Sequence, residues 1–409
     1  MALTFFMLAG EASGDTHAAK LITALKAIDP AARCLGMGGP KMAAAGMEVL
    51  KDLDGMQVVG FWEVAKKYGF FKKVFYELLD RVKQTKPDAL ICIDYPGFNL
   101  RFAKEVKKLG IPVLYYIVPQ VWAWKAMRAK SMAEFVDRAY CVFDFEPPWF
   151  LKYGLKAEFV GHPLVDHDSG LRIADCGLEL PPGPKTVAFL PGSREGELRA
   201  HTEPMCQAFS HLKRATALRG LFSIQAGITK GYANFVKHYL DLGEHISEYY
   251  KRVGGTPRAD MRPLTEAQVI VSNESEFRAA VKHHSFTLPA VSDFSVVKSG
   301  TSTLEAGLAG NPMCVVYKAS SISYAIAHLL VNIPVFSLVN IVLGRYAVPE
   351  LLQSDVNPQR IAQEIERGLN DEKYREQQKA ALAELPKKLG GPGASSRAAK
   401  GMIDFLRGR

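Results

Sequence analysis

The residues best suited to bind an anionic group lie in a turn of small hydroxylated residues late in the chain. Ser299, Gly300 and Thr301 follow the apolar run 294–297 and precede a short helical pattern. Helix N-termini carry partial positive charge and unpaired N–H groups, so this turn is expected to face an anion. Glu305, one turn further on, suits a sugar hydroxyl better than a phosphate. The alternative is a well-capped helix whose glutamate is merely exposed.

A second turn with similar chemistry follows the apolar run 187–190. It places Ser193 and Arg194 directly after a Pro-Gly pair. A guanidinium can bind phosphate through two parallel hydrogen bonds, and the glycine lets the backbone approach closely. Two such turns in one domain predict a single diphosphate held between them. A surface arginine in an ordinary loop is the alternative.

Asp94 is the candidate for proton transfer. It directly follows the buried apolar run 89–93 and precedes a tight Tyr-Pro-Gly turn. The carboxyl ends of parallel strands border the crevice where ligands bind, so this carboxylate could act as a general base. The alternative is a turn or helix cap by Asp94 or Asn99.

The first turn of the chain carries three further polar candidates, Glu11, Ser13 and Asp15. They follow the apolar run 3–9 in a Gly-Glu-Ala-Ser-Gly-Asp sequence and precede an amphipathic helical pattern. Strand, glycine-rich turn and helix is how a Rossmann-like sheet begins, but the dinucleotide fingerprint is absent. The alternative is a plain turn in which Asp15 caps the helix.

Aromatic residues mark two other segments. Trp122 and Trp124 follow the strand pattern 113–118 and could form a platform for a sugar or an acyl chain, although such residues more often pack in cores. Residues 61–76 interleave large aromatics with lysines, a pattern typical of a helix in a membrane interface. A core helix with a solvated basic face is the alternative.

Strand patterns that alternate with helical patterns must position these residues. They predict an α/β protein of two Rossmann-like doubly wound domains that face a cleft. We expect one domain over 1–170, a second over 171–345, and C-terminal helices over 346–409 that pack back on the first. Residues 349–353 are expected to begin a helix, and Asn357 to cap the long helix that follows.

The totals limit the class of protein. The 409 residues are 48% hydrophobic and carry a net charge of +9, which favours an anionic partner such as nucleic acid, a phosphate-bearing substrate or a membrane surface. Six cysteines without a C-x-x-C spacing indicate reduced core residues in a cytosolic protein and no metal site. Neither a signal peptide nor an apolar run of about 18 residues is apparent, so any membrane contact is expected to be peripheral.

The chain resembles the lipid-A-disaccharide synthase family, which comprises inverting GT-B-type glycosyltransferases of Gram-negative bacteria. Nine motifs match in the family's order and cover most of the chain. They are LAGEASGD (8–15), GMGGPKM (36–42), IDYPGFN (93–99), VPQVWAW (118–124), FVGHPLVD (159–166), LPGSR (190–194), SGTSTLE (299–305), SLVNIVLGR (337–345) and PELLQ (349–353).

The resemblance implies a reaction. A UDP-2,3-diacylglucosamine donor would glycosylate 2,3-diacylglucosamine 1-phosphate (lipid X), giving the β-1,6-linked lipid A disaccharide 1-phosphate and UDP. It implies an acceptor-binding domain over 1–170 and a UDP-sugar-binding domain over 171–345. It implies no cofactor, metal or nucleic acid, allows a homodimer, and places the protein in the cytoplasm, peripherally associated with the inner face of the inner membrane.

The resemblance also implies roles for individual residues. Asp94 would be the base; the donor would be bound by Arg194, Ser193, Ser299, Gly300, Thr301, Glu305 and Asn340; the acceptor or cleft would be contacted by Glu11, Ser13, Asp15 and Trp122. The chain departs from the family in two places. Gly97 replaces a second aspartate, which favours Asp94 as the functional carboxylate, and the region 228–292 is atypical.

Two other functions remain open from the sequence. The fold could serve another UDP-sugar transferase or an epimerase of envelope synthesis. It could also serve a basic, non-enzymatic protein that binds membrane surfaces or RNA, although no RNA-binding motif is present.

Overall fold

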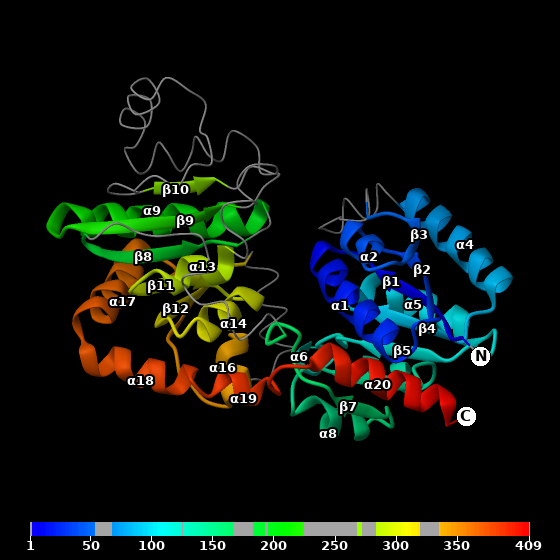
Figure 1. Cartoon of the computed structure of the whole chain (residues 1–409). Helices are drawn as coiled ribbons and strands as arrows, with labels where there is room; N and C mark the ends of the chain where they lie inside the picture. Colours follow the sequence, from blue (N-terminus) through cyan, green and yellow to red (C-terminus); the bar gives the residue numbers. More distant parts are fainter. Residues whose placement is uncertain are drawn as a thin grey trace. The chain divides into compact units, whose positions relative to one another are not determined.

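The computed structural model describes residues 2–53, 68–124, 126–166, 183–192, 195–224, 268–271, 284–319 and 335–408. Contacts divide the chain into two compact units (Figure 1). Unit 1 comprises Met1–Asp168 together with Leu389–Arg409, and unit 2 comprises Ser169–Lys388. Each unit contains one parallel sheet flanked by helices, which confirms the predicted α/β class with two doubly wound domains.

Unit 1 is built on a seven-stranded parallel sheet in the order β3-β2-β1-β4-β5-β6-β7. Alternate residues of each strand point to opposite faces, so Phe5 and Met7 pack under one helical layer while Phe6 and Leu8 pack under the other. The elements are β1 (Thr4–Ala9), α1 (Ala12–Ile28), β2 (Arg33–Met37), α2 (Pro40–Ala44), β3 (Glu48–Lys51), α4 (Tyr68–Thr85), β4 (Ala89–Ile93), α5 (Pro96–Lys107), β5 (Val113–Tyr116), α6 (Val121–Trp124), α7 (Ala126–Ala133), β6 (Arg138–Cys141), α8 (Glu146–Leu151), β7 (Ala157–Phe159) and α20 (Ala394–Arg407).

Unit 2 repeats this plan with six parallel strands in the order β10-β9-β8-β11-β12-β13. Figure 1 shows α17 and α14 on different sides of this sheet, and α9 packs with α17. The elements are β8 (Lys185–Leu190), α9 (Glu195–Ala215), β9 (Leu218–Ile224), β10 (Gln268–Val271), α13 (His284–Ala290), β11 (Phe294–Lys298), α14 (Thr301–Leu308), β12 (Met313–Tyr317), α16 (Leu338–Leu343), β13 (Glu350–Leu352), the 3₁₀ turn η2 (Gln353–Asp355), α17 (Pro358–Asn370), α18 (Glu372–Leu382) and α19 (Leu385–Lys388).

The C-terminal region that the sequence analysis grouped as 346–409 is divided between the two units. Residues up to Lys388 pack in unit 2, and α20 lies against α1 in unit 1. Asp166 fixes this last helix, because its carboxylate accepts from the backbone N–H groups of Gly393, Ala394 and Ser395 at 2.7–2.9 Å. A carboxylate on free N–H groups at a helix N-terminus is a favourable cap.

The prediction of a helix beginning at 349–353 is wrong. Residues Glu350–Leu352 form β13, a parallel strand paired with β12, and only the single turn η2 follows. Proline followed by glutamate favours a helix start locally, but the free edge of β12 offers hydrogen bonds that a helix there would leave unused. The predicted cap by Asn357 is confirmed, since its side chain accepts from the N–H of Arg360 at the start of α17.

The aromatic and basic segment 61–76 lies partly outside the described residues. In the described part, α4 turns Phe70, Phe71 and Phe75 toward the core of unit 1, while Lys72 and Lys73 are exposed. This part therefore has the form of a core helix with a basic outer face. Among the described residues, no helix combines the length and apolar character that crossing a membrane requires.

Candidate active site

The candidate residues of unit 1 gather at one edge of its sheet. β1 and β4 are neighbours, and the chain leaves their carboxyl ends through Gly10–Glu11 and Asp94–Tyr95 respectively. The strand order reverses between β1 and β4, and such a switch point is where open α/β sheets bind ligands. The structure thus brings Glu11 and Asp94, 83 positions apart in the printed sequence, to adjacent turns.

Asp94 has a strained backbone. Its φ is +43°, and that of the next residue, Tyr95, is +49°. Ile117, just beyond the end of the neighbouring strand β5, has φ +57°. A left-handed conformation in a non-glycine residue costs on the order of 1–3 kcal/mol, and such residues cluster at functional sites. Three of them at two neighbouring strand ends mark this edge of the sheet as specialised.

The Gly10 turn is shaped by an aromatic ring and leaves no room for a larger residue. A Cβ built on Gly10 would lie 2.2 Å from Cδ1 of Tyr95. Burial, together with the smaller effect of the neighbouring Glu11 carboxylate, raises the pKa of the Tyr95 hydroxyl to about 12. Glycine at position 10 is therefore required by the packing of the Tyr95 ring, which reaches this turn from the end of β4.

Asp15 and Ser13 belong to the same turn, but Asp15 is buried and Ser13 is exposed. Asp15 is buried, and its carboxylate accepts from the backbone N–H groups of Gly39, Lys41 and Met42 at 2.9–3.1 Å. It caps α2 and not its own helix, and both oxygens are used within the protein. Ser13 is exposed in the first turn of α1. Of the two, Ser13 is the one placed to meet a ligand.

Trp122 is fixed by a buried carboxylate that the sequence analysis missed. Its indole Nε1 donates to Oε1 of Glu146 at 3.0 Å, while Oε2 accepts from the N–H groups of Val142 and Phe143. Glu146 is fully buried, and this burial raises its pKa to about 7 against the lowering effect of the hydrogen bonds. Nothing in the local sequence distinguishes Glu146 from a surface helix-start glutamate.

His162 is buried, and its ring centroid lies 5.7 Å from that of Phe143. Its ring Nδ1 accepts from the backbone N–H of Leu164 at 3.1 Å. The backbone N–H of His162 donates to the carbonyl of Leu389. Burial lowers its pKa to about 4, although Asp166 acts in the opposite direction. The imidazole is therefore neutral at pH 7 and structural.

In unit 2, the two predicted anion-binding turns are also neighbours at a switch point. β8 pairs with β11, and their carboxyl ends lead into Pro191–Gly192 and Ser299–Thr301. Ser299 is buried and Thr301, at the start of α14, is exposed. Ser193 and Arg194 lie outside the described residues. Glu305 is half-buried on α14.

An ion pair between these two turns escaped the sequence analysis. Lys298, the last residue of β11, places Nζ 2.7 Å from Oε1 of Glu197 in the first turn of α9. A Cβ on Gly192, whose φ is +120°, would lie 2.6 Å from Oε2 of the same glutamate. Glycine at 192 thus makes room for the carboxylate that holds Lys298 beside the start of α14.

His201 links the first turn of α9 to the segment after β12. Its Nδ1 contacts the carbonyl of Glu197 at 2.6 Å, and its Nε2 accepts from the N–H of Lys318 after β12. Burial lowers its pKa to about 4, so that the ring is neutral at pH 7. The partner in α9 is a main-chain carbonyl, so no pairing of side-chain types in the sequence indicated this contact.

Asn340, predicted to contact the donor, has no hydrogen-bonding atom left for it. Its amide donates to the carbonyl of Val348 and to Oε1 of Glu350, and its Oδ1 accepts from the N–H groups of Ala347 and Val348. The side chain is completely buried. Asn340 therefore organises the loop before β13, and any effect on the donor must be indirect.

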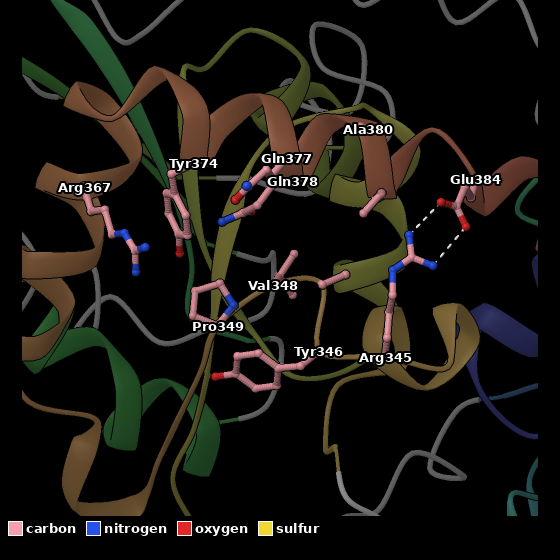
Figure 2. A pocket seen from close by; sticks show the side chains of 12 residues that line it. Arg345, Tyr346, Val348, Pro349, Arg367, Tyr374, Gln377, Gln378, Ala380 and Glu384 are labelled. Carbon is pink, nitrogen blue, oxygen red and sulfur yellow. Dashed lines mark hydrogen bonds and ion pairs between the residues drawn. The ribbon is translucent and has the colours of Figure 1, made fainter.

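The cavity in Figure 2 is separate from these turns. It has a volume of about 550 Å³ and lies between the loop 345–349 and α18. Gln378, which lines the cavity from α18, accepts from the N–H of Met313, the first residue of β12. The ion pair of Arg345 with Glu384 lies at one end of the cavity (Figure 2). The cavity is thus at the amino ends of the strands, away from the candidate turns. Within the described ranges, no group of three or more His, Cys, Asp or Glu residues is arranged to hold a metal ion.

Comparisons with known proteins agree with the motifs. The family model "Lipid-A-disaccharide synthetase" matches residues 5–240 and 257–400. The lipid-A-disaccharide synthase of Anaeromyxobacter dehalogenans (strain 2CP-1 / ATCC BAA-258) is 38% identical over 98% of this chain and 97% of its own length. That of Myxococcus xanthus (strain DK1622) is 36% identical over the same shares.

Solved structures show the same fold at low sequence identity. A putative UDP-N-acetylglucosamine 2-epimerase from Listeria monocytogenes has a TM-score of 0.60 at 11% identity, covering 100% of this chain and 96% of its own. The calicheamicin glycosyltransferase CalG4 has a TM-score of 0.54 at 13% identity, covering 100% and 99%. These likenesses show a GT-B-like fold, and the chain belongs to the lipid-A-disaccharide synthase family of UDP-sugar glycosyltransferases that act in lipid A biosynthesis.

Proposed function

We propose that the protein condenses UDP-2,3-diacylglucosamine with 2,3-diacylglucosamine 1-phosphate. The products are the β-1,6-linked lipid A disaccharide 1-phosphate and UDP. The observation that carries this proposal is the position of Asp94 beside the Glu11 turn at the switch point of unit 1. Family membership supplies the class of substrates, and the turns supply the chemistry.

Asp94 is the general base in this proposal. Inversion is a single displacement at the anomeric carbon, and the 6-hydroxyl of the acceptor must lose its proton as the new bond forms. A carboxylate at the end of β4 can take that proton. Glu11 and Ser13 from the first turn and Trp122 after β5 are proposed to contact the acceptor or line its site, because they follow neighbouring strands of the same sheet.

The turns of unit 2 hold the leaving group in this proposal. Negative charge develops on UDP as the glycosidic bond to the donor breaks. Arg194, Ser193 and the N–H groups at the start of α14 are suited to stabilise this charge without a metal ion. Glu305, half-buried one turn into α14, is proposed to accept from a ribose or sugar hydroxyl.

Membrane contact is part of the same proposal. Both substrates carry acyl chains and must be drawn from a membrane, and we place the enzyme at the cytoplasmic face of the inner membrane. The exposed lysines of α4 and the net charge of +9 support attraction to an anionic surface. The lysines Lys66 and Lys67, which would extend this basic face, lie outside the described residues.

Product analysis tests the proposal. The purified protein is incubated with both acylated substrates, and disaccharide 1-phosphate and UDP are measured. Asp94→Asn should lower the rate by about 100-fold or more while UDP binding is retained. Asp80→Asn, which neutralises an exposed carboxylate on α4, is the control and should leave the rate unchanged. A second incubation contains UDP-N-acetylglucosamine, and its consumption, with no disaccharide formed in the first, would instead identify an epimerase or another transferase.

A further inference from the structure

The left-handed conformation at Asp94 has an identifiable set of supports. Its carbonyl oxygen accepts from the hydroxyl of Tyr115 at 2.7 Å and from Nδ2 of Asn99 at 2.8 Å. Its N–H donates to the carbonyl of Tyr116 on β5 at 3.2 Å. Both backbone groups of Asp94 are therefore held, and a strained conformation persists only when its surroundings hold it in this way.

Asn99 connects this carbonyl with two others. The same Nδ2 lies 3.2 Å from the carbonyl of Ile93 and 3.3 Å from that of Leu8, near the ends of β4 and β1. Asn99 is completely buried in the first turn of α5. Its backbone N–H donates to the carbonyl of Tyr95, the residue before this helix. One amide thus ties the two strand ends that flank the switch point.

Tyr115 supplies the second support from a different element. It is completely buried in β5, and only its hydroxyl reaches the end of β4. Its neighbour Tyr116 is equally buried but points to the opposite face of the sheet, where its hydroxyl lies 3.5 Å from Oγ of Ser395. The two tyrosines are therefore equally buried on one strand, and they differ in the face of the sheet and in the partner that the hydroxyl group meets.

We infer that Tyr115 and Asn99 are positioning residues, which hold the backbone of Asp94 so that its carboxylate is aimed at the acceptor hydroxyl. Removal of the Tyr115 hydroxyl lets the peptide after Asp94 rotate toward an unstrained conformation, which redirects the carboxylate. This inference rests on the proposed role of Asp94 as base. A misplacement of a reacting group by about 1 Å can lower a rate on the order of 100-fold.

A double-mutant cycle tests this positioning role. Tyr115→Phe should lower kcat by about 10- to 100-fold, while KM for both substrates and the affinity for UDP stay within about two-fold. In an Asp94→Asn background, where no carboxylate remains to be aimed, Tyr115→Phe should cause no further loss. Asparagine is chosen at 94 because it tolerates the left-handed conformation.

Tyr116→Phe is the matched control. It removes a buried hydroxyl on the opposite face of the sheet and keeps the backbone carbonyl that accepts from the N–H of Asp94, so it should leave kcat unchanged whatever it does to the melting temperature. Asn99→Ala should act like Tyr115→Phe, and Tyr115→Phe alone decides the matter if Asn99→Ala fails to fold. A Tyr115→Phe enzyme with the wild-type kcat overturns the inference, as does an equal loss of kcat in both backgrounds. An active Asp94→Asn enzyme instead refutes the proposed base, so the two failures are distinguishable.

Discussion

The buried carboxylate of Glu146 should make the stability of the protein depend on pH, and Glu146→Gln should remove that dependence. Glutamine has the charge of the protonated glutamic acid, and its amide oxygen can take the place of Oε2, which accepts from the backbone N–H groups of Val142 and Phe143. Its NH2 group then replaces the oxygen that accepts from Trp122, so that one bond is lost at every pH. The variant is therefore uncharged at every pH, and the lost bond adds an offset that does not vary with pH.

The size and sign of the effect follow from the raised pKa. Burial raises the pKa of Glu146 from its ordinary value of 4.5 to about 7. The folded state then binds a proton that the unfolded state has lost, so stability falls as the pH rises from about 4.5 to about 7. The difference in pKa corresponds to roughly 3 kcal/mol for this fully buried group. Against the wild type, the variant should gain about that much free energy of unfolding across this interval.

Chemical denaturation of both proteins at several values between pH 4.5 and pH 8 measures this gain. His162 and His201, whose pKa values are lowered to about 4, act in the opposite direction, since their contribution is lost as the pH falls from 6.5. They are present in both proteins and cancel in the difference. Glu366→Gln, at an exposed position on α17, is the control and should show a constant difference. A constant difference for Glu146→Gln as well would refute the reasoning.

Two other predictions concern charge. Arg194→Ala should weaken UDP binding by about 1.5–3 kcal/mol, the usual contribution of a hydrogen bond to a charged group, as measured by calorimetry; unchanged binding would remove Arg194 from the donor site. Charge reversal of the exposed Lys72 and Lys73 should weaken binding to anionic vesicles in a sedimentation assay, whereas reversal of the equally exposed Lys373 and Lys387 in unit 2 should not. Equal loss by both pairs would indicate that net charge and not the α4 surface governs binding.

The sequence was sufficient to predict the features that depend on local pattern. Apolar runs of strand length, each followed by a polar turn and a helical pattern, predict parallel strands whose carboxyl ends share one edge. That rule places Glu11, Asp94, Gly192 and Ser299 just beyond strand ends, whereas the pairing of β1 with β4 and of β8 with β11, which makes these turns neighbours, came from the structure.

Features that depend on a distant partner could not be predicted. Asp15 caps α2 and not α1 because the chain returns to it at Gly39, which no local pattern indicates. The same holds for the contact of Glu146 with Trp122 and for the ion pair of Lys298 with Glu197. For β13, a strand edge outweighed a local preference for helix.

The two units meet different demands at their switch points, and their backbones reflect this. In unit 2 the groups suited to bind phosphate include backbone N–H groups, so a glycine can occupy a left-handed position such as that of Gly192 without strain. In unit 1 the proposed base is a side chain, and the residue at the end of β4 therefore cannot be glycine. Asp94 must adopt the left-handed conformation with its carboxylate attached, and the hydrogen bonds of Tyr115 and Asn99 offset the strain. Substitutions of Tyr115 and Asn99, which hold the Asp94 backbone, should consequently lower the turnover rate. Substitutions at the turns of unit 2 should first lower the affinity for the nucleotide.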